Sequence, residues 1–251
     1  MPQPPYTRTG ALDVVVLAAG RGSRLGHLGA QTPKWLLDVG GTTIAARQLA
    51  GIAAAGARTI RVVTGHAAGA IERFAAGRPE LCLVHNPRYA DRNNWFSVLL
   101  ALRDIGDADR VVVVNGDLCA EPDWFARFLV DAATTPHDAL IAVDLGRVLT
   151  DESMKVEARG GALEAIGKTG VAAAVGEYVG MLMARGTALA RLRAALEGLE
   201  RIPAAADAWY EHAVADAARG GVRWQIWPTP NSRWVEIDDG HDHAAALGMA
   251  A

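Results

Sequence analysis

The stretch DVVVLAAGRGSRLGHLGAQTPK, residues 13–34, joins an apolar run to a loop of glycines and cations. The run Val14–Leu17 predicts a parallel strand that is buried on both of its faces. Glycines allow sharp turns and bring backbone N–H groups close to an anion, while arginine adds a fixed positive charge. The loop carries both kinds of residue: Gly20, Arg21, Gly22, Arg24 and Gly26, with Lys34 after Pro33. This combination predicts a site for a polyphosphate.

Two common phosphate loops do not match this stretch. The Walker loop ends in Gly-Lys-Ser or Gly-Lys-Thr, and that tripeptide is absent here. The dinucleotide pattern G-x-G-x-x-G fails by one position, because Gly26 lies four residues after Gly22. The same pattern expects an acidic residue after the next strand, whereas the predicted strand at 60–63 is followed by Thr64-Gly65-His66. Neither of these two phosphate-binding classes is therefore indicated.

The sequence LAAGRGSRL at residues 17–25, followed by Pro33-Lys34, resembles the signature of the sugar-phosphate nucleotidyltransferase superfamily. The resemblance implies that this loop wraps a triphosphate. It also implies that Arg24 and Lys34 are catalytic and stabilise the triphosphate and the departing pyrophosphate. The nucleotide-binding residues that it implies in this stretch are Leu17, Ala18, Ala19, Gly20, Gly22 and Ser23.

Apolar runs and amphipathic segments alternate along the first half of the chain, which predicts an α/β fold with right-handed crossovers. The resemblance implies a Rossmann-like, mixed, mostly parallel sheet flanked by helices, of the nucleotide-diphospho-sugar transferase type. We expect a single domain over residues 1–251, with a loose leader at 1–12 and a short strand at 35–39. Short strands at 155–158 and 162–166 begin a small subregion that, by the resemblance, binds the acceptor.

The bulk composition argues against several classes of partner. With 25 basic and 28 acidic residues the net charge is −3, which disfavours a nucleic-acid partner held by charge. No apolar run approaches the ~20 residues of a membrane helix, so we expect no membrane partner. Cys82 and Cys119 stand apart among apolar neighbours and predict buried thiols in a reducing cytoplasm. We expect a cytoplasmic protein, with a homodimer left open.

A polar loop at residues 85–97 leads into a predicted helix and contains Asn93, Asn94 and Ser97. Either asparagine can cap the helix, and capping can be their whole role. The pattern N-N-x-x-S also resembles the choline-phosphate and aminoalkylphosphonate cytidylyltransferase branch of the superfamily. That resemblance implies that all three residues bind the nucleotide and read a pyrimidine edge, which favours CTP.

Two aspartates follow predicted strands. The run at 111–114 leads into Asn115-Gly116-Asp117, and open α/β sheets bind ligands at such carboxyl ends of strands. Gly116 lets the backbone approach the nucleotide. The resemblance implies that Asp117 holds Mg²⁺ against the phosphates, and that Asp238, at the end of W-V-E-I-D, is the second metal ligand. The alternative for both aspartates is capping of the helix that follows.

The second half of the chain supplies the predicted acceptor site. By the resemblance, lysines would meet a phosphate, and an acid with aromatic rings would meet a cationic head. The predicted acceptor-binding residues are Lys155, Lys168, Glu177, Tyr178 and Trp209. Trp95, Tyr210 and Trp234 complete a candidate aromatic wall, and Glu211 adds a second carboxylate. The alternative for each ring is packing in the core, and for each lysine a solvated position at the end of a strand. A sugar would instead need many polar partners for its hydroxyl groups.

These residues together predict a Mg²⁺-dependent cytidylyltransferase that joins CTP to phosphocholine or an aminoalkylphosphonate and releases pyrophosphate. Catalysis would depend on positioning and electrostatics, without a covalent intermediate. The alternative enzymes are a sugar 1-phosphate nucleotidyltransferase that uses UTP, dTTP or GTP, and a molybdopterin cytidylyltransferase. An inactive nucleotide-sensing subunit is the alternative from another class, and the joint presence of Lys34, Asp117 and Asp238 argues against it.

Overall fold

The computed structural model describes residues 12–57, 59–106, 110–229 and 234–250. The expected leader at 1–12 lies outside this part of the chain, except for Leu12, which is fully buried. Residues 231–233, which precede the W-V-E-I-D stretch, also lie outside it. Among the helices of the described residues, none combines the length and the apolar surface that a membrane crossing requires.

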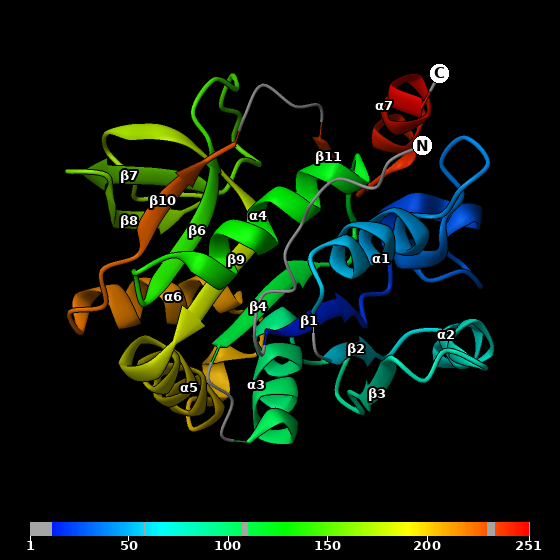
Figure 1. Cartoon of the computed structure of the whole chain (residues 1–251), viewed down its shortest axis with the longest axis horizontal. Coiled ribbons are helices and arrows are strands. Elements are labelled where there is room, and N and C mark those ends of the chain that lie inside the picture. The colour runs from blue at the N-terminus through cyan, green and yellow to red at the C-terminus, as the bar shows by residue number, and fades with distance from the viewer. Residues whose placement is uncertain (1–11, 58, 107–109, 230–233, 251) are drawn as a thin grey trace.

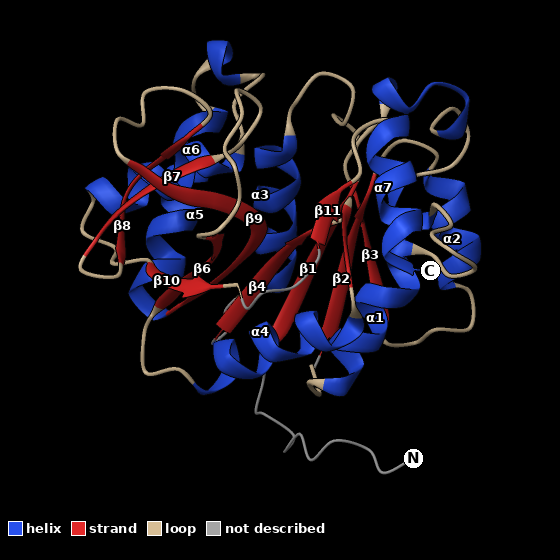
Figure 2. Cartoon of the chain, turned by 90° about the horizontal axis from the view of Figure 1, so that it is seen from above, coloured by secondary structure: helices blue, strands red, loops and turns tan. Residues whose placement is uncertain are grey.

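A mixed sheet forms the centre of the described structure, and helices lie on both of its faces (Figure 1 and Figure 2). Its strands are β1 (Asp13–Ala18), β2 (Thr59–Thr64), β3 (Leu81–His85), β4 (Arg110–Asn115), β6 (Ala139–Asp144), β7 (Lys155–Arg159), β8 (Ala162–Gly167), β9 (Ala174–Arg185) and β10 (Gln225–Pro228). Their order is β3-β2-β1-β4-β9-β6-β10-β8-β7. A separate pair joins β5 (Leu118–Ala120) to β11 (Trp234–Glu236) in antiparallel register.

Strand direction divides the sheet into two halves. β1 is parallel to β2 and β4, and β2 is parallel to β3, as expected of βαβ units. β9 is antiparallel to β4 and β6 and also pairs with β7. The strands β9, β6, β10, β8 and β7 therefore form a closed ring of paired strands. Because β9 is antiparallel, its first residues reach the same edge of the sheet as the last residues of β1 and β4. Both halves therefore contribute side chains to one edge.

Two layers of helices cover the sheet. The helices are α1 (Ile44–Ala54), α2 (Ala68–Ala75), α3 (Asn94–Ile105), α4 (Pro122–Thr134), α5 (Gly186–Glu200), α6 (Tyr210–Arg219) and α7 (Gly240–Ala250), with 3₁₀ turns η1 (Ser23–Leu28), η2 (Lys34–Leu36) and η3 (Pro203–Ala205). Val14 and Val16 of β1 face the core that includes α1 and α4, whereas Val15 faces the core that includes α3, α5 and α6. The strand is therefore buried on both faces, as its continuous apolar run predicts.

The predicted strand at 35–39 is wrong. Residues Lys34–Leu36 form a 3₁₀ turn that is closed by local backbone hydrogen bonds. Asp38 makes an isolated bridge to Thr43, which is too short a pairing to count as a strand. Trp35 is fully buried in the core. The apolar character of this segment therefore reflects burial beneath the glycine loop, and local turns satisfy its backbone instead of a neighbouring strand.

The prediction of two buried thiols is correct for one cysteine. Cys119 in β5 is buried, and burial raises the pKa of its thiol. Cys82 is exposed, which contradicts the expectation. It lies on β3, at the end of the strand order beside β2. Cys82 and Leu83 point to opposite faces of the strand and are both exposed, so this part of the end strand is little covered on either face.

Gly51 of α1 lies where this helix meets α4, and a Cβ there would sit 2.4 Å from the Pro122 carbonyl oxygen and 2.6 Å from Cβ of Phe125. We therefore predict that Gly51→Ala lowers the free energy of unfolding by about 1–3 kcal/mol through overpacking. Gly198→Ala is the matched control, because a Cβ at that position of α5 meets nothing within 4 Å. It should raise stability by up to about 1 kcal/mol. Urea denaturation measures both changes, and equal stabilities would contradict the close helix contact.

Candidate active site

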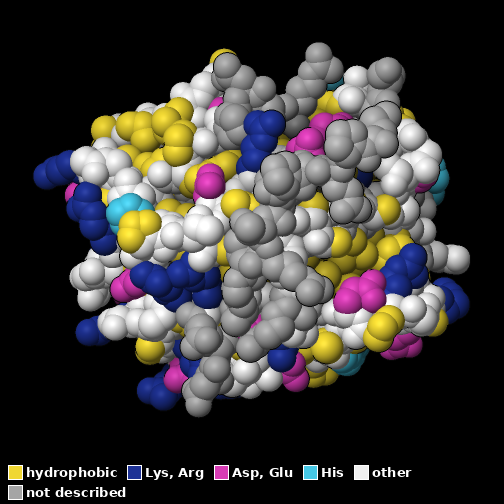
Figure 3. All heavy atoms as spheres, viewed as in Figure 1, with side chains coloured by type: hydrophobic (Ala, Val, Ile, Leu, Met, Phe, Trp, Pro, Cys, Tyr) yellow, Lys and Arg dark blue, Asp and Glu magenta, His cyan; other side chains and the backbone are white. Residues whose placement is uncertain are grey.

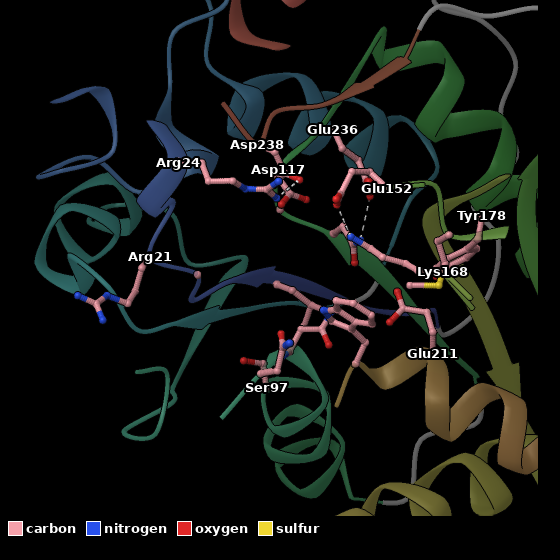
Figure 4. Close-up of a pocket in the computed structure, with 18 of the residues that line it drawn as sticks. Arg21, Arg24, Ser97, Asp117, Glu152, Lys168, Tyr178, Glu211, Glu236 and Asp238 are labelled. Atoms are coloured by element: carbon pink, nitrogen blue, oxygen red, sulfur yellow. Dashed lines mark hydrogen bonds and ion pairs between the residues drawn. The ribbon is translucent and has the colours of Figure 1, made fainter. Parts of the chain in front are cut away.

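A cleft opens at the edge of the sheet where the ends of β1 and β4 and the start of β9 converge (Figure 4). Its volume is about 700 Å³, and it adjoins a smaller cavity of about 220 Å³. The two cavities share lining residues from the glycine loop, the β4–β5 turn and the segment after β11, among them Gly20, Arg24, Asp117 and Asp238. The starts of α3 and α6 line the far side of the larger cavity.

The predicted nucleotide-binding residues lie along these two cavities: Leu17, Ala18, Ala19, Gly20, Gly22, Ser23, Asn93, Asn94, Ser97 and Gly116. At two of these positions the backbone disfavours every residue other than glycine. Gly22 has a backbone φ of 58°, a value that residues other than glycine rarely adopt. A Cβ on Gly116 would sit 2.4 Å from the carbonyl oxygen of Leu17, where the β4–β5 turn passes the end of β1. The structure thus brings these residues together, and their binding of a nucleotide remains a prediction.

An ion-pair cluster, formed by Arg24, Lys34, Asp117 and Asp238, lies where the two cavities meet. Figure 4 shows three of its side chains, those of Arg24, Asp117 and Asp238. Lys34 Nζ donates to Asp238 Oδ1 at 2.5 Å and to Asp117 Oδ2 at 3.2 Å. Arg24 donates through its Nη2 to the other carboxylate oxygen of Asp238 at 2.6 Å. One ammonium group therefore reaches both carboxylates, so the two acids converge on a single point in space.

Electrostatics in this cluster favour the charged forms. Burial lowers the pKa of Lys34, but the carboxylates of Asp117 and Asp238 outweigh that effect and raise the pKa above its ordinary value. Burial raises the pKa of Asp238, but Lys34 and Arg24 outweigh it and the net pKa is lowered. An anionic carboxylate pair is the state that binds a hard divalent cation. Among the described residues, no group of three or more His, Cys, Asp or Glu side chains converges to hold a metal without further ligands.

Neither aspartate caps the helix that follows it. The N-cap residue of α4 is Glu121, whose side chain makes no cap hydrogen bond, and the Asp117 carboxylate contacts Lys34. At the start of α7 the Asp239 Oδ1 accepts hydrogen bonds from two backbone N–H groups. The carboxylate of Asp238 is directed at Lys34 instead. The capping alternative is therefore wrong for both residues, and their binding of a metal stays a prediction.

Asn93 and Asn94 use their side chains to hold α3 against α6. Asn93 is the N-cap residue of α3, where its Oδ1 accepts from the Asn94 N–H at 2.7 Å. Asn94 Oδ1 in turn accepts from the Tyr210 N–H at 2.9 Å. Ser97 is buried, and its hydroxyl accepts from the amide of Asn86 at 2.9 Å. The capping role is confirmed, while base recognition by these residues stays a prediction.

Most of the predicted acceptor residues line the cleft, and Lys155 is the exception. Lys155 Nζ donates to the carbonyl oxygen of Lys168 at 2.9 Å and so braces the loop that follows β8. Lys168 lines the cleft and forms an ion pair with Glu152 at 2.8 Å. Glu177 pairs with Arg147 at 3.2 Å. Lys168 therefore lies where the predicted phosphate-binding role requires it, whereas Lys155 does not line the cleft.

Core packing, the alternative to an aromatic wall, is confirmed for Trp95 and Tyr210. Trp95 and Tyr210 are buried among the residues behind the cleft and do not line it. Tyr178 does line the cleft, but it is only 2% exposed. Its hydroxyl group is 2.8 Å from that of Tyr210, and burial raises the pKa of both phenols well above the ordinary value. These rings brace the cleft from behind and offer it little surface.

The other two aromatic residues of the wall carry cations that belong to the chain itself. Lys168 Nζ lies 4.8 Å from the ring centroid of Trp209. The Trp209 ring is also stacked against His212, with an interplanar angle of 8°. The guanidinium carbon of Arg147 lies 4.0 Å from the ring centroid of Trp234. Cation–π attraction thus holds two positive charges at the wall of the cleft.

Charged residues that the sequence analysis did not single out also line the cleft. Glu236 lines the cleft and lies inside the W-V-E-I-D motif, which the sequence indicated because of Asp238. Arg147 and Glu152 lie in the irregular segment between β6 and β7, where no local pattern indicates them. Burial raises the pKa of Glu236 to about 8, with a contribution from Asp117. Burial also raises the pKa of Glu211 to about 7.

Gln48 of α1 connects the segments that carry the ion-pair cluster. Its fully buried side chain accepts from Trp35 Nε1 at 2.9 Å. Its Nε2 donates to the carbonyl oxygens of Asn115 at 2.9 Å and Leu118 at 2.8 Å. Trp35 directly follows the lysine of the cluster, and the two carbonyls stand on either side of Asp117. Gln48 therefore positions the lysine and the first aspartate of the cluster relative to each other.

The arrangement of strands and helices is that of nucleotidyltransferases. A solved CTP:phosphocholine cytidylyltransferase from Streptococcus pneumoniae superposes with a TM-score of 0.76 at 16% identity, over 96% of this chain and 100% of that chain. The chain belongs to the family of MobA-like NTP transferase domains, which matches residues 14–214. The fold class and the nucleotidyltransferase resemblance expected from the glycine loop are therefore confirmed.

Curated relatives give the same class. The chain is 33% identical over 243 residues to a CMP-5'-(3-aminopropyl)phosphonate synthase from Streptomyces rubellomurinus, over 92% of this chain and 38% of the relative. It is 31% identical over 193 residues to a bifunctional protein GlmU from Methylibium petroleiphilum, over 74% of this chain and 41% of the relative. The chain thus spans about two-fifths of the length of these relatives.

Loss of the Gln48 amide should destabilise the protein, because it would leave the Trp35 N–H and two buried carbonyl groups without their partner. We predict that Gln48→Leu lowers the free energy of unfolding by about 2–4 kcal/mol, since each unsatisfied buried group costs about 1–3 kcal/mol. Gln31→Leu is the matched control at an exposed site and should change stability by no more than about 0.5 kcal/mol. Urea denaturation of the two variants compares them. A Gln48→Leu variant as stable as its control would contradict the bridging role.

Proposed function

We propose that the chain catalyses cytidylyl transfer from CTP to a small phosphorylated or phosphonate acceptor, with release of pyrophosphate. The observation that carries this proposal is the convergence of Lys34, Asp117 and Asp238 at the end of the glycine loop. The relative whose name describes a CMP-aminopropylphosphonate product supports the choice of nucleotide and acceptor. Phosphocholine is the second acceptor that we consider, because its charge pattern is similar.

In the proposed reaction an oxygen of the acceptor's phosphate or phosphonate attacks the α-phosphorus of CTP. A new P–O bond forms to the acceptor, the bond between the α-phosphorus and the oxygen that bridges to the β-phosphorus breaks, and pyrophosphate carries that electron pair away. The glycine loop binds the triphosphate through its backbone N–H groups. Lys34 and Arg24 stabilise the negative charge of the leaving pyrophosphate. No side-chain nucleophile is required, because the acceptor itself is the nucleophile.

The residues present fit a Mg²⁺ ion. The carboxylates of Asp117 and Asp238 approach one ammonium group from two sides, so their oxygens are already directed at a shared cationic position. Mg²⁺ is commonly held by one or two carboxylates together with substrate phosphates, and two such acids are what this site offers. When bound, the ion would supply charge neutralisation at the phosphates. Asp117 and Asp238 would hold it.

Release of pyrophosphate with a matrix of nucleotides and acceptors tests the proposed function. The nucleotides are CTP, UTP, GTP and dTTP, and the acceptors are 2-aminoethylphosphonate, phosphocholine and glucose 1-phosphate, all with Mg²⁺. We expect CTP to be the preferred nucleotide and glucose 1-phosphate to be the poorest acceptor. A preference for glucose 1-phosphate with UTP, dTTP or GTP would move the protein to the sugar 1-phosphate enzymes. Nucleotide binding without turnover of any acceptor would indicate a sensing subunit.

Two neighbouring aspartates distinguish a metal-binding role from a structural one. Asp238→Asn should reduce turnover by about 10²-fold or more at saturating Mg²⁺, because the substitution removes a charged oxygen ligand. Asp239→Ala removes the cap of α7 and should lower stability by about 1 kcal/mol while turnover persists. EDTA should inactivate the unmodified protein reversibly. Full turnover by the Asp238→Asn variant would place the second metal ligand elsewhere.

A further inference from the structure

We propose that the cleft selects an acceptor with a primary ammonium head, which the Glu211 carboxylate binds, over an acceptor with a trimethylammonium head. This inference rests on the proposed function and narrows its acceptor. Three features of the cleft carry it: a buried carboxylate oxygen without a partner, the pairing of the other acids, and the covered faces of the aromatic rings.

Glu211 lies in the first turn of α6 and lines the cleft. The residue is 5% exposed, and among the described residues its Oε2 atom has no hydrogen-bond partner. In Figure 4 its carboxylate points into the cleft, on the side away from Arg21 and Arg24. A buried carboxylate oxygen without a donor is costly, so this atom is suited to a ligand that brings a donor with it.

Three other acids that line the cleft have partners. Glu152 pairs with Lys168, and Glu236 accepts a hydrogen bond from the Asn115 amide at 3.2 Å. Glu177 Oε2 is buried without a hydrogen bond, as Glu211 Oε2 is, but it lies 3.2 Å from the Arg147 guanidinium. Glu211 differs from these three carboxylates because, among the described residues, its buried oxygen has neither a hydrogen bond nor an ion pair.

The number of N–H donors on an ammonium group decides whether it can form a hydrogen bond to that oxygen. A primary ammonium carries three N–H donors and can bond directly to a carboxylate. A trimethylammonium group has no N–H donor and is best bound by open aromatic faces. Here the Trp209 ring is covered by Lys168 and His212, and the Trp234 ring by Arg147. Tyr178 is too deeply buried to offer a face.

We assign the cations on those rings to the anionic end of such an acceptor, although each also pairs with an acid, Lys168 with Glu152 and Arg147 with Glu177. Lys168 and Arg147 both line the cleft, and their positions over Trp209 and Trp234 hold positive charge there. A phosphonate group carries the complementary negative charge. The cleft therefore pairs fixed cations with an unmatched carboxylate, which is the charge pattern of a zwitterionic aminoalkylphosphonate.

The test compares two acceptors that differ only in methylation of the nitrogen: 2-aminoethylphosphonate and its N,N,N-trimethyl analogue. Initial rates are measured at saturating CTP and Mg²⁺. We expect kcat/KM for the primary amine to exceed that for the trimethyl analogue by about 10-fold or more, the scale of one buried charge-assisted contact. A preference for the trimethyl analogue would overturn the inference while leaving cytidylyl transfer intact. Absence of pyrophosphate release with every acceptor would overturn the proposed function and this inference with it.

Glu211→Gln then tests the residue. The variant should raise KM for 2-aminoethylphosphonate by about 10-fold or more, leave KM for CTP within about 2-fold, and leave kcat/KM for the trimethyl analogue nearly unchanged. The matched control is Glu200→Gln. Glu200 lies on α5 and forms an exposed ion pair with Arg103 of α3, so the variant should leave all three constants unchanged. Equal losses for both acceptors would assign Glu211 a structural role and overturn the inference. If the variant does not fold, the ranking of the two acceptors by the unmodified protein still decides the selectivity.

Discussion

The contact of one ammonium group with two carboxylates is the interaction on which the rest of the site depends. Lys34 meets Asp117 at 3.2 Å and Asp238 at 2.5 Å, although these residues come from three distant parts of the chain. Two carboxylates held this close would repel each other without a cation between them. The ammonium offsets that repulsion and so ties the glycine loop, the β4–β5 turn and the segment after β11 to one another.

The partial exposure of this cluster supports the proposal that a metal ion binds there. Exposed ion pairs contribute little to stability, and the side chains of Lys34, Asp117 and Asp238 are 16%, 28% and 35% exposed. They are therefore screened only in part and remain within reach of ligands. The more rigid support comes from Gln48, which lies behind the cluster and holds the backbone on both sides of Asp117. Gln48 would therefore keep the backbone around Asp117 in place in the proposed metal-bound state.

The antiparallel strand β9 gives the cleft its second wall. Parallel strands deliver only their last residues to the edge where ligands bind. β9 enters that edge with its first residues, so Glu177 and Tyr178 face the loops that follow β1 and β4. Lys168 and Arg147 complete this wall by lying over Trp209 and Trp234. The wall of the cleft on the β9 side is thus rich in charged side chains, whereas the wall on the side of β1 and β4 contains the glycine loop.

Short stretches of sequence were enough to predict β1, the glycine loop, the strand before Asp117 and the α/β fold class. Each of these depends on neighbours in the chain: a continuous apolar run, a glycine needed by the backbone, or a regular alternation of elements. Other features could not be predicted in this way. The turn at Lys34–Leu36, the exposure of Cys82 and the separation of Lys155 from the cleft all depend on what packs against each segment. The same is true of the rings covered by Lys168 and Arg147, and of the unmatched oxygen of Glu211, because contacts between residues far apart in the chain leave no periodic mark on the sequence around either partner.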